Sequence, residues 1–545
     1  MRRRRSLALT LLVAGLAMFA AAGAHPAGGA DEARKGGILR MGSFEDVGQL
    51  DTALGYGGPS WAITFATCAK LFNHPDEDGA AGARVIPEVV RSYTVSRDRR
   101  TYDFELRRTF RFHTGVQVTA QSFAAAFNRN AHPGQKATDA TGFMREIEGA
   151  QAMIDGNAQS ISGVRVVGRY RLQIRLTKPL GDFPQRLTLP FFCPVLPGTP
   201  VDSRGVDPAG SGPYYVAEHV VNQRVVLKRN PFYRGDRPAN VGQVVWTVGE
   251  TREACLVAIE ADRIDHCFPF GVPSAAYGAL AERYGVNRPG GQFFVSPAPV
   301  TWYLAFNHDR PAFKGPGQIP LKKAINFALD RAALVRPLGY LAGKRTDQIL
   351  PPALGRAVGI YPLGGPNLAA AKRWLARARI KPTKLMFYTT SAPSSVAQSL
   401  ALEFQLKQIG IDLDVKYFDA ATLVEKIQTR GEPFDIARDG WAADYADGGS
   451  FLETLLDGRR IRPTGSLNVA YFDDPPTNAR IDAAKQLTGD ARRKASEDLD
   501  VELMRTNPPW APLYNTFNRS FVSKSFGCFL YHPFYGVDLA AACKR

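Results

Sequence analysis

Histidine, cysteine, serine and acidic side chains carry most enzyme chemistry, but their spacing in this chain matches no known catalytic motif. There is no Gly-x-Ser-x-Gly segment to present a serine nucleophile and no His-Glu-x-x-His pair to bind zinc. Residues 339–344 end in Gly-Lys, and the next residue, Arg345, replaces the Ser or Thr that binds Mg²⁺ in a phosphate loop. The eight histidines are dispersed. We therefore expect no catalytic residue, metal site or cofactor. A secreted hydrolase is the alternative, because catalytic triads can assemble from distant residues.

The first 24 residues predict an export signal. Arg2, Arg3, Arg4 and Arg5 precede an apolar run over residues 7–24 that ends in small residues, and cleavage after Ala24 or after position 30 fits this pattern. A retained membrane anchor and the twin-arginine export route are alternatives. No cysteine precedes Cys68, so a lipid-bearing cysteine cannot follow the signal. We expect a soluble periplasmic protein.

The rest of the chain has the composition of a globular protein with more than one core. Its 545 residues are 45% hydrophobic and 22% charged, and no later run reaches 18 apolar residues. This length favours two or three lobes. The net charge of +17 comes from scattered basic residues, four of which leave with the signal. A solvated basic surface on a monomer is expected, with no nucleic-acid partner.

Short β-rich runs dominate the first half of the chain. Alternating side chains predict a strand over residues 101–106, a hairpin formed by 164–167 and 172–176, and a strand over 224–228. Residues 119–128 are expected to form a helix that Thr119 caps.

The second half has helical periodicity between strands. Residues 321–331 and 368–379 predict amphipathic helices. A strand over 384–388, a helix over 396–409 and a strand over 412–417 follow in βαβ order. This order indicates an α/β lobe.

Four segments carry a family resemblance. They are residues 102–129 (YDFELRRTFRFHTGVQVTAQSFAAAFNR), 210–216 (GSGPYYV) with 226–233 (VLKRNPFY), 303–331 (containing LAFN and KKAINFALDR) and 434–455 (containing GWAADY). In this order the segments resemble blocks of the peptide/nickel-type solute-binding proteins, family five. Thr109 and His113 depart from the residues usual in the first block. The resemblance spans nearly the whole mature chain and implies the solute-capturing component of an ABC importer. Its partners would be an inner-membrane permease and a cytoplasmic ATPase.

The resemblance also implies a fold. We expect an α/β, periplasmic-binding-protein-like molecule with two main lobes, a hinge and an inserted third lobe. Lobe I would comprise residues 36–70, 201–297 and 518–545, lobe II residues 71–200, and lobe III residues 298–517. Two crossings of the chain would form the hinge.

The six cysteines fit local disulfides in an oxidising compartment. Two pairs are close in sequence, Cys255 with Cys267 and Cys528 with Cys543. Sequence alone leaves the connectivity open. The family's lobe limits place Cys68 and Cys193 near the junctions of lobes I and II, which suggests a disulfide between them.

The family also implies where the ligand binds. In peptide-binding relatives the aspartate of the Gly-Trp-x-x-Asp segment receives the ligand's α-amino group, and Asp444 occupies that position. Trp441 could pack beside the same cation, and Tyr514 falls where relatives bring the chain back to the cleft. Alternatively, Trp441 is a core residue and Asp444 caps a turn.

One departure from the family bears on the ligand. Asp447 is followed by Gly448 and Gly449, where relatives usually have a proline. Relatives also bind nickel chelates, haem, opines and some sugars. A peptide is therefore the first expectation for the ligand, and one of these solutes is the alternative.

Overall fold

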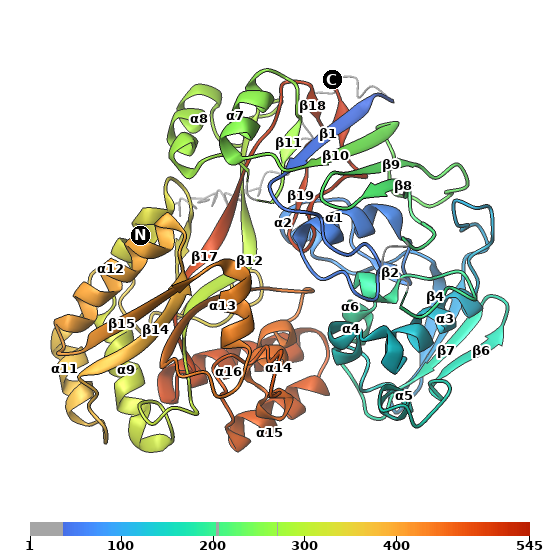
Figure 1. The fold of residues 1–545 in the computed structure, drawn as a ribbon. Coiled ribbons are helices and arrows are strands. Elements are labelled where there is room, and N and C mark those ends of the chain that lie inside the picture. Colours follow the sequence, from blue (N-terminus) through green and yellow to red (C-terminus); the bar gives the residue numbers. More distant parts are fainter. Residues whose placement is uncertain (1–35, 203–206, 270) are drawn as a thin grey trace, which may run out of the picture.

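A computed structural model describes residues 36–202, 207–269 and 271–545 of the chain. The expected signal peptide lies outside these residues. Within them, the structure has no helix whose length and apolarity would let it cross a membrane. Three large sheets organise the described chain, and we name the parts built on them lobes I, II and III (Figure 1).

Lobe I is built on a five-stranded sheet with the order β11-β1-β10-β9-β8. The strands are β1 (Ile38–Ser43), β8 (Tyr214–Val220), β9 (Arg224–Arg229), β10 (Gln243–Val248) and β11 (His266–Cys267). Its helices are α1 (Gly58–Thr67), α7 (Arg252–Glu260) and α8 (Tyr277–Tyr284). β1 pairs in parallel with both β10 and β11, so segments more than 200 residues apart form one sheet.

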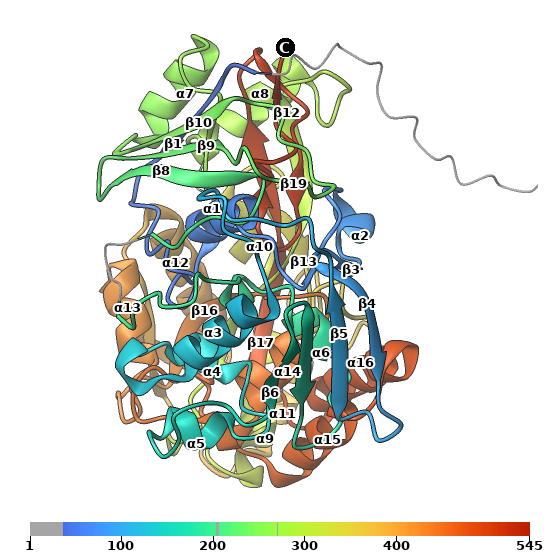
Figure 2. The same ribbon diagram turned by 90° about the vertical axis from the view of Figure 1, so that its right-hand side faces the viewer.

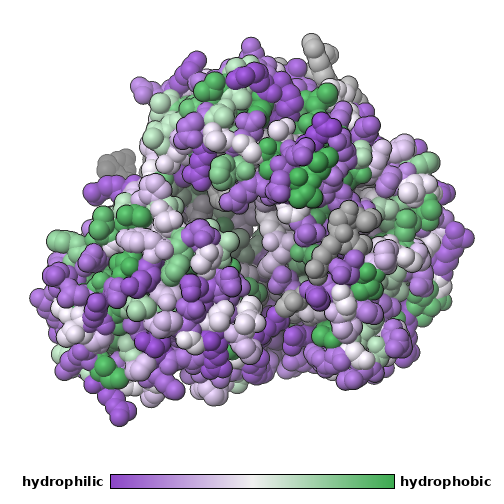
Figure 3. All heavy atoms as spheres, viewed as in Figure 1, coloured by the Kyte–Doolittle hydropathy of each residue, from purple (hydrophilic) through white to green (hydrophobic). Residues whose placement is uncertain are grey.

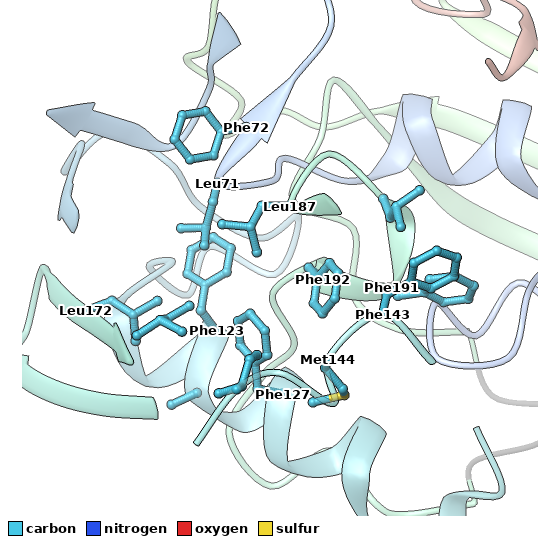
Figure 4. Close-up of a cluster of buried hydrophobic side chains, with 14 of the residues drawn as sticks. Leu71, Phe72, Phe123, Phe127, Phe143, Met144, Leu172, Leu187, Phe191 and Phe192 are labelled. Atoms are coloured by element: carbon cyan, nitrogen blue, oxygen red, sulfur yellow. The ribbon is translucent and has the colours of Figure 1, made fainter. Parts of the chain in front are cut away.

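Lobe II contains a four-stranded antiparallel sheet with the order β4-β5-β7-β6. It comprises β4 (Val90–Val95), β5 (Thr101–Leu106), β6 (Val164–Gly168), β7 (Arg171–Arg175), α3 (Ala120–Ala131), α4 (Thr138–Gly142), α5 (Ala150–Ile154) and α6 (Phe183–Arg186). Phe123 and Phe127 lie four residues apart on α3 and enter the apolar core with Leu172 of β7 (Figure 4). The expected helix and hairpin are confirmed.

Lobe III holds a six-stranded sheet with the order β13-β17-β12-β16-β14-β15. These strands are β12 (Phe293–Phe306), β13 (Gly343–Arg345), β14 (Lys384–Thr390), β15 (Asp412–Phe418), β16 (Ile436–Ala442) and β17 (Trp510–Phe521). One apolar core joins the sheet to α9 (Ile319–Ala328), α10 (Arg331–Val335), α11 (Leu368–Ala376) and α12 (Pro393–Lys407). A second core joins it to α13 (Ala420–Ile427), α14 (Gly449–Leu456), α15 (Pro475–Lys485) and α16 (Gly489–Thr506).

The expected βαβ unit is confirmed, because β14 and β15 are parallel and α12 connects them. The helix expected over residues 321–331 is wrong at its end. α9 stops at Ala328, and the side chain of Asp330 accepts a hydrogen bond from the Ala333 N–H (3.0 Å), which starts α10. A carboxylate that can cap a new helix competes with helix continuation.

The crossings between lobes I and III are the two long strands β12 and β17, which run from one lobe into the other (Figures 1 and 2). Their antiparallel pairing is interrupted between Pro297 and Thr301. Pro297 and Pro299 lack the N–H that a continuous ladder needs. We propose this interruption as the hinge and the lobe limits expected above as the limits of the three units.

The six described cysteines form three disulfides. Cys255–Cys267 and Cys528–Cys543 are local, while Cys68–Cys193 joins residues 125 apart with a Cα–Cα distance of 5.9 Å. The suggested long-range disulfide is thus confirmed. It ties the end of α1 in lobe I to the segment that leaves lobe II.

A buried network of charges fastens lobe II to lobe III. Arg186 of lobe II contacts Asp182 (3.1 Å) in its own lobe and Glu453 (2.8 Å) on α14. Arg492 on α16 contacts the same two carboxylates, each at 3.0 Å. Burial alone would raise the pKa of Glu453, yet Arg186, Lys485 and Arg492 hold that pKa well below its usual value. Each arginine has its full set of counter-charges only while the lobes are together.

Removing the Cys68–Cys193 disulfide should destabilise the chain more than removing Cys255–Cys267. The longer loop restricts the unfolded chain more, so the double variant Cys68→Ala/Cys193→Ala should lose about 2 kcal/mol more than Cys255→Ala/Cys267→Ala. All four cysteines are buried to a similar degree, so the second variant is a matched control. Urea unfolding without reductant measures both. Equal losses would contradict the loop argument.

Substitution of Arg186 should weaken the contact between lobes II and III. Arg186→Gln leaves buried carboxylates short of a cation, which costs about 3–5 kcal/mol. Urea unfolding and the radius of gyration from small-angle scattering measure the loss and any opening. Arg493→Gln is the control and should cost at most about 1 kcal/mol, because within the described residues Arg493 pairs with Asp490 and Glu497 on the exposed side of α16. Equal stability of the two variants would show that the network does not fasten the lobes.

Candidate functional site

Asp444 lies in the turn between β16 and α14, and its side chain is enclosed where the three lobes meet. The residue is only 5% exposed. Its Oδ1 accepts a hydrogen bond from the Tyr56 hydroxyl of lobe I (2.7 Å), and its Oδ2 accepts one from the Ser450 hydroxyl (3.1 Å). The Asp444 N–H donates to the same Ser450 oxygen (2.7 Å). Two hydroxyls from different lobes thus fix the carboxylate.

The glycines after Asp447 shape this turn. Arg492 donates to both oxygens of Asp447 at 2.7 and 2.8 Å, and the Gly449 N–H donates to Oδ1 at 2.7 Å. A Cβ on Gly448 would lie 2.6 Å from Ser496, and one on Gly449 would lie 2.7 Å from Arg492. Glycine at both positions lets α16 approach the start of α14. Gly448 and Gly449, which stand where the family usually has a proline, therefore permit the close contact that positions Ser450 next to Asp444.

Burial raises the pKa of Asp444 from 3.8 to about 7, although the bonds from Tyr56 and Ser450 lower it. In the described chain no lysine or arginine forms an ion pair with Asp444. A carboxylate in this state has lone pairs left for a further donor, and a cation would stabilise its ionised form.

Trp441 lies beside this carboxylate, at the end of β16. Its indole N–H donates to the backbone oxygen of Ser450 (3.0 Å), and its ring centroid is 6.4 Å from that of Tyr56. Tyr56 also packs on Trp61 of lobe I and Phe191 of lobe II. An aromatic group drawn from all three lobes thus surrounds the bond from Tyr56 to Asp444.

Tyr514 lies elsewhere. Its ring stacks on Trp302 with a centroid distance of 6.3 Å, and its hydroxyl accepts a hydrogen bond from Arg438 (3.3 Å). It belongs to the core under α9–α12, whereas Trp441 packs against the core under α13–α16. In the described structure Tyr514 shares no hydrogen bond or ring contact with Asp444 or Trp441. The structure therefore brings together two of the three expected residues.

The strand that leads to Asp444 has an open edge. β14 pairs with β16 only at Ile436 and Ala437, while β12 pairs with β16 along its whole length. Residues 438–442 are thus paired on one side only within the described chain. An unpaired strand edge can accept an extended peptide backbone.

Two hollows adjoin the meeting point of the lobes, and the face in Figure 3 is visibly hollowed at its centre. A cavity of about 1120 Å³ lies beside the β12–β17 crossings and is lined in part by Phe294, Pro297 and Phe534; Asp444 is not in its wall. A smaller pocket of about 210 Å³ is lined by Tyr56 of lobe I and by residues of lobes II and III. Asp444 does not line this pocket either, but Tyr56, which donates a hydrogen bond to Asp444, does.

Sequence reasoning missed Tyr56 and Ser450. Tyr56 is 388 residues from Asp444, and nothing in its local sequence marks it. Ser450 had a usable signal, since it follows Asp444 by six residues at the start of α14. Among the described residues, no cluster of His, Cys, Asp or Glu could hold a metal ion.

Comparison with known proteins shows the family and the fold. Residues 84–463 match the family described as bacterial extracellular solute-binding proteins, family 5 Middle. The chain is 24% identical over 477 residues to the periplasmic oligopeptide-binding protein OppA of Escherichia coli (strain K12), an alignment that covers 80% of this chain and 84% of OppA. It is 26% identical over 496 residues to the periplasmic murein peptide-binding protein MppA of the same strain, with 87% of each covered.

The fold is shared with solved structures over nearly its full length. The structure of clavulanic acid biosynthesis oligopeptide binding protein 2 superposes with a TM-score of 0.84 at 25% identity, covering 94% of this chain and 96% of the other. The structure of Escherichia coli MppA gives a TM-score of 0.74 at 23% identity, covering 94% and 99%. These likenesses confirm the periplasmic-binding-protein-like α/β fold.

The raised pKa of Asp444 predicts that this residue costs stability at neutral and alkaline pH. The folded chain holds the proton more tightly than the unfolded chain, so stability falls as pH rises from about 4 to about 7 and stays reduced above that. Asp444→Asn should therefore gain about 2–4 kcal/mol at pH 8, with a gain that shrinks toward pH 4. Urea unfolding across this range measures it. Asp236→Asn, at an exposed carboxylate, is the control. A gain independent of pH would contradict the assignment.

Proposed function

Since the chain belongs to family 5 of the bacterial extracellular solute-binding proteins, components of ABC transporters, we propose that it binds peptides with a free amino terminus. It captures them between its lobes in the periplasm and delivers them to an inner-membrane permease driven by a cytoplasmic ATPase. It acts as a binding protein and not as an enzyme. The observation that carries the proposal is Asp444, a buried carboxylate that forms no ion pair within the described residues and follows an open strand edge.

The carboxylate suits an ammonium ligand. Tyr56 occupies one lone pair of Oδ1 and Ser450 one of Oδ2, so each oxygen keeps acceptor capacity. An ammonium group placed there forms charge-assisted hydrogen bonds in a site closed to water, where such bonds are strongest. The pairing lowers the pKa of Asp444 from about 7 and removes the cost of the bare buried charge.

The peptide chain would extend from this anchor along β16. Residues 438–442 offer backbone N–H and C=O groups on the edge that β14 leaves unpaired. Backbone bonding of this kind tolerates varied side chains. The names of OppA and MppA record peptide binding for those relatives, which supports the same class of ligand here.

A different amine-bearing solute is the second candidate, and the Gly448–Gly449 turn favours it. This turn differs from the family's usual sequence beside the anchor, and its close contact with Arg492 fixes a local shape of its own. Such a solute would use Asp444 in the same way but would not need the open edge of β16.

Blocking the amine tests the anchor. Trialanine should bind more tightly than N-acetyl-trialanine by at least about 30-fold, and Asp444→Asn should remove this difference, because loss of one partner of a buried charged pair costs about 2–5 kcal/mol. Isothermal titration calorimetry near pH 7.5 measures both ligands. Asp236→Asn, which removes an exposed carboxylate, should keep the preference. Equal affinity of the wild-type protein for the free and acetylated peptides would refute Asp444 as amine anchor.

A further inference from the structure

The small pocket beside Tyr56 is surrounded by arginines from two lobes. Arg145 enters its wall from lobe II, and Arg459, Arg460 and Arg462 enter from the segment that follows α14 in lobe III. Asp139 on α4 is the acidic residue in this wall. Four arginines and one acidic residue thus line a space of about 210 Å³.

These arginines differ in how their charge is compensated. Arg459 is neutralised by Asp457 (2.7 Å) and Asp482 (2.6 Å). Arg460 donates to the backbone oxygen of Gly142 (2.9 Å), which supplies a hydrogen bond but no negative charge. In the described chain, no carboxylate lies within the 4.0 Å ion-pair distance of Arg145, Arg460 or Arg462. Three positive charges therefore share the pocket without a bonded counter-charge.

The surroundings of Arg462 lower its pKa. Its pKa is lowered by burial first and then by the positive charge of Arg145, with a smaller contribution from Arg460. Asp139 acts in the opposite direction but does not cancel the shift. The wall of the pocket is electropositive, and an anion inside it would relieve the repulsion among the guanidinium groups.

The pocket and the proposed amine anchor share a residue. Tyr56 lines the pocket and donates its hydroxyl to Asp444 Oδ1 at 2.7 Å. Thr454 lines it from α14, the helix that also carries Ser450. Asp139 and Arg460 of the pocket wall act electrostatically on Asp444, so a ligand held at Asp444 lies within range of the pocket's charges.

We propose that this pocket binds an anionic group of the ligand, a carboxylate or a phosphate, through Arg145, Arg460 and Arg462. The inference rests on the proposed function and narrows its substrate class to solutes that carry an acidic group beside the anchored amine. For a peptide, the acidic group is the side chain of the first residue. Guanidinium groups suit this task because their N–H donors match the oxygens of carboxylates and phosphates.

Matched peptides test the proposal. Isothermal titration calorimetry compares Glu-Ala-Ala with Gln-Ala-Ala, and O-phosphoserine-Ala-Ala with Ser-Ala-Ala, at low ionic strength. At least one acidic peptide should bind about 10-fold or more tightly than its neutral counterpart, and salt should reduce that preference. The pair with the larger preference identifies carboxylate or phosphate as the favoured group.

Arginine variants tie any preference to the pocket. Arg462→Gln and Arg145→Gln should each reduce the acidic preference at least about threefold while leaving the affinity for Gln-Ala-Ala within twofold. Arg493→Gln removes one positive charge from the exposed side of α16 and should keep the preference. The proposal is overturned if both acidic peptides bind no better than their neutral partners. It is equally overturned if Arg493→Gln reduces the preference as much as Arg462→Gln.

Failure of this proposal and failure of peptide binding have different signatures. If neutral peptides bind and depend on Asp444 but the acidic preference is missing, the pocket proposal alone fails. If no peptide binds, the same titrations with glutarate and inorganic phosphate decide the matter. If glutarate or phosphate binds and Arg462→Gln weakens that binding, the pocket proposal stands without peptide binding. If neither anion binds, or if Arg462→Gln leaves their binding unchanged, the pocket proposal is refuted.

Discussion

The buried charges between lobes II and III are the interaction on which the arrangement of the site depends. Burying charged side chains costs free energy, and the ion pairs that they form with one another offset this cost. The buried charges here are Arg186, Arg492, Asp182 and Glu453. Both arginines bridge to a carboxylate of the other lobe. Separation of the lobes would leave each arginine with fewer counter-charges. The network therefore specifies one relative position of two lobes that share no sheet.

Helix α14 connects this arrangement of the lobes to the candidate site. Glu453 lies on this helix, and Arg492 binds both Glu453 and Asp447 just before the helix begins. The contact fixes the turn that places Ser450 under Asp444. The charges of the network compensate one another, whereas burial raises the pKa of Asp444 more than the bonds from the Tyr56 and Ser450 hydroxyls lower it. This contrast separates a structural carboxylate such as Glu453 from one that suits a cationic ligand.

The sequence predicted the helices and strands and their order better than it predicted which distant residues come into contact. Phe123 and Phe127 indicated α3 through their spacing, and the strand–helix–strand order indicated the parallel pair β14–β15. The predicted end of α9 was wrong because Asp330 caps a new helix, and the spacing of apolar residues does not indicate such a cap. Asp444 was predicted as a ligand-binding residue from its motif, and this stays a prediction. Tyr56, which bonds it from 388 residues away, required the fold.

The pocket arginines show the same limit. Arg460 and Arg462 lie on one segment, but Arg145 reaches them from lobe II, more than 300 residues earlier in the chain. Before the fold is known, all three belong to a scattered basic composition. Tyr514 is the converse case, because position along the chain suggested the cleft while its side chain packs with Trp302 and Arg438.

The covalent and backbone links decide which lobes can move relative to each other. The Cys68–Cys193 disulfide links lobe I to lobe II and limits how far these two lobes can separate. Lobe III joins lobe I through β12 and β17, whose ladder is broken between Pro297 and Thr301. Rotation at this proposed hinge would separate Tyr56 from Asp444 and Asp182 from Arg492 together. Opening would therefore expose the proposed anchor and break the network in one step, and under the proposed function a ligand that bridges Asp444 and Tyr56 would stabilise the closed state.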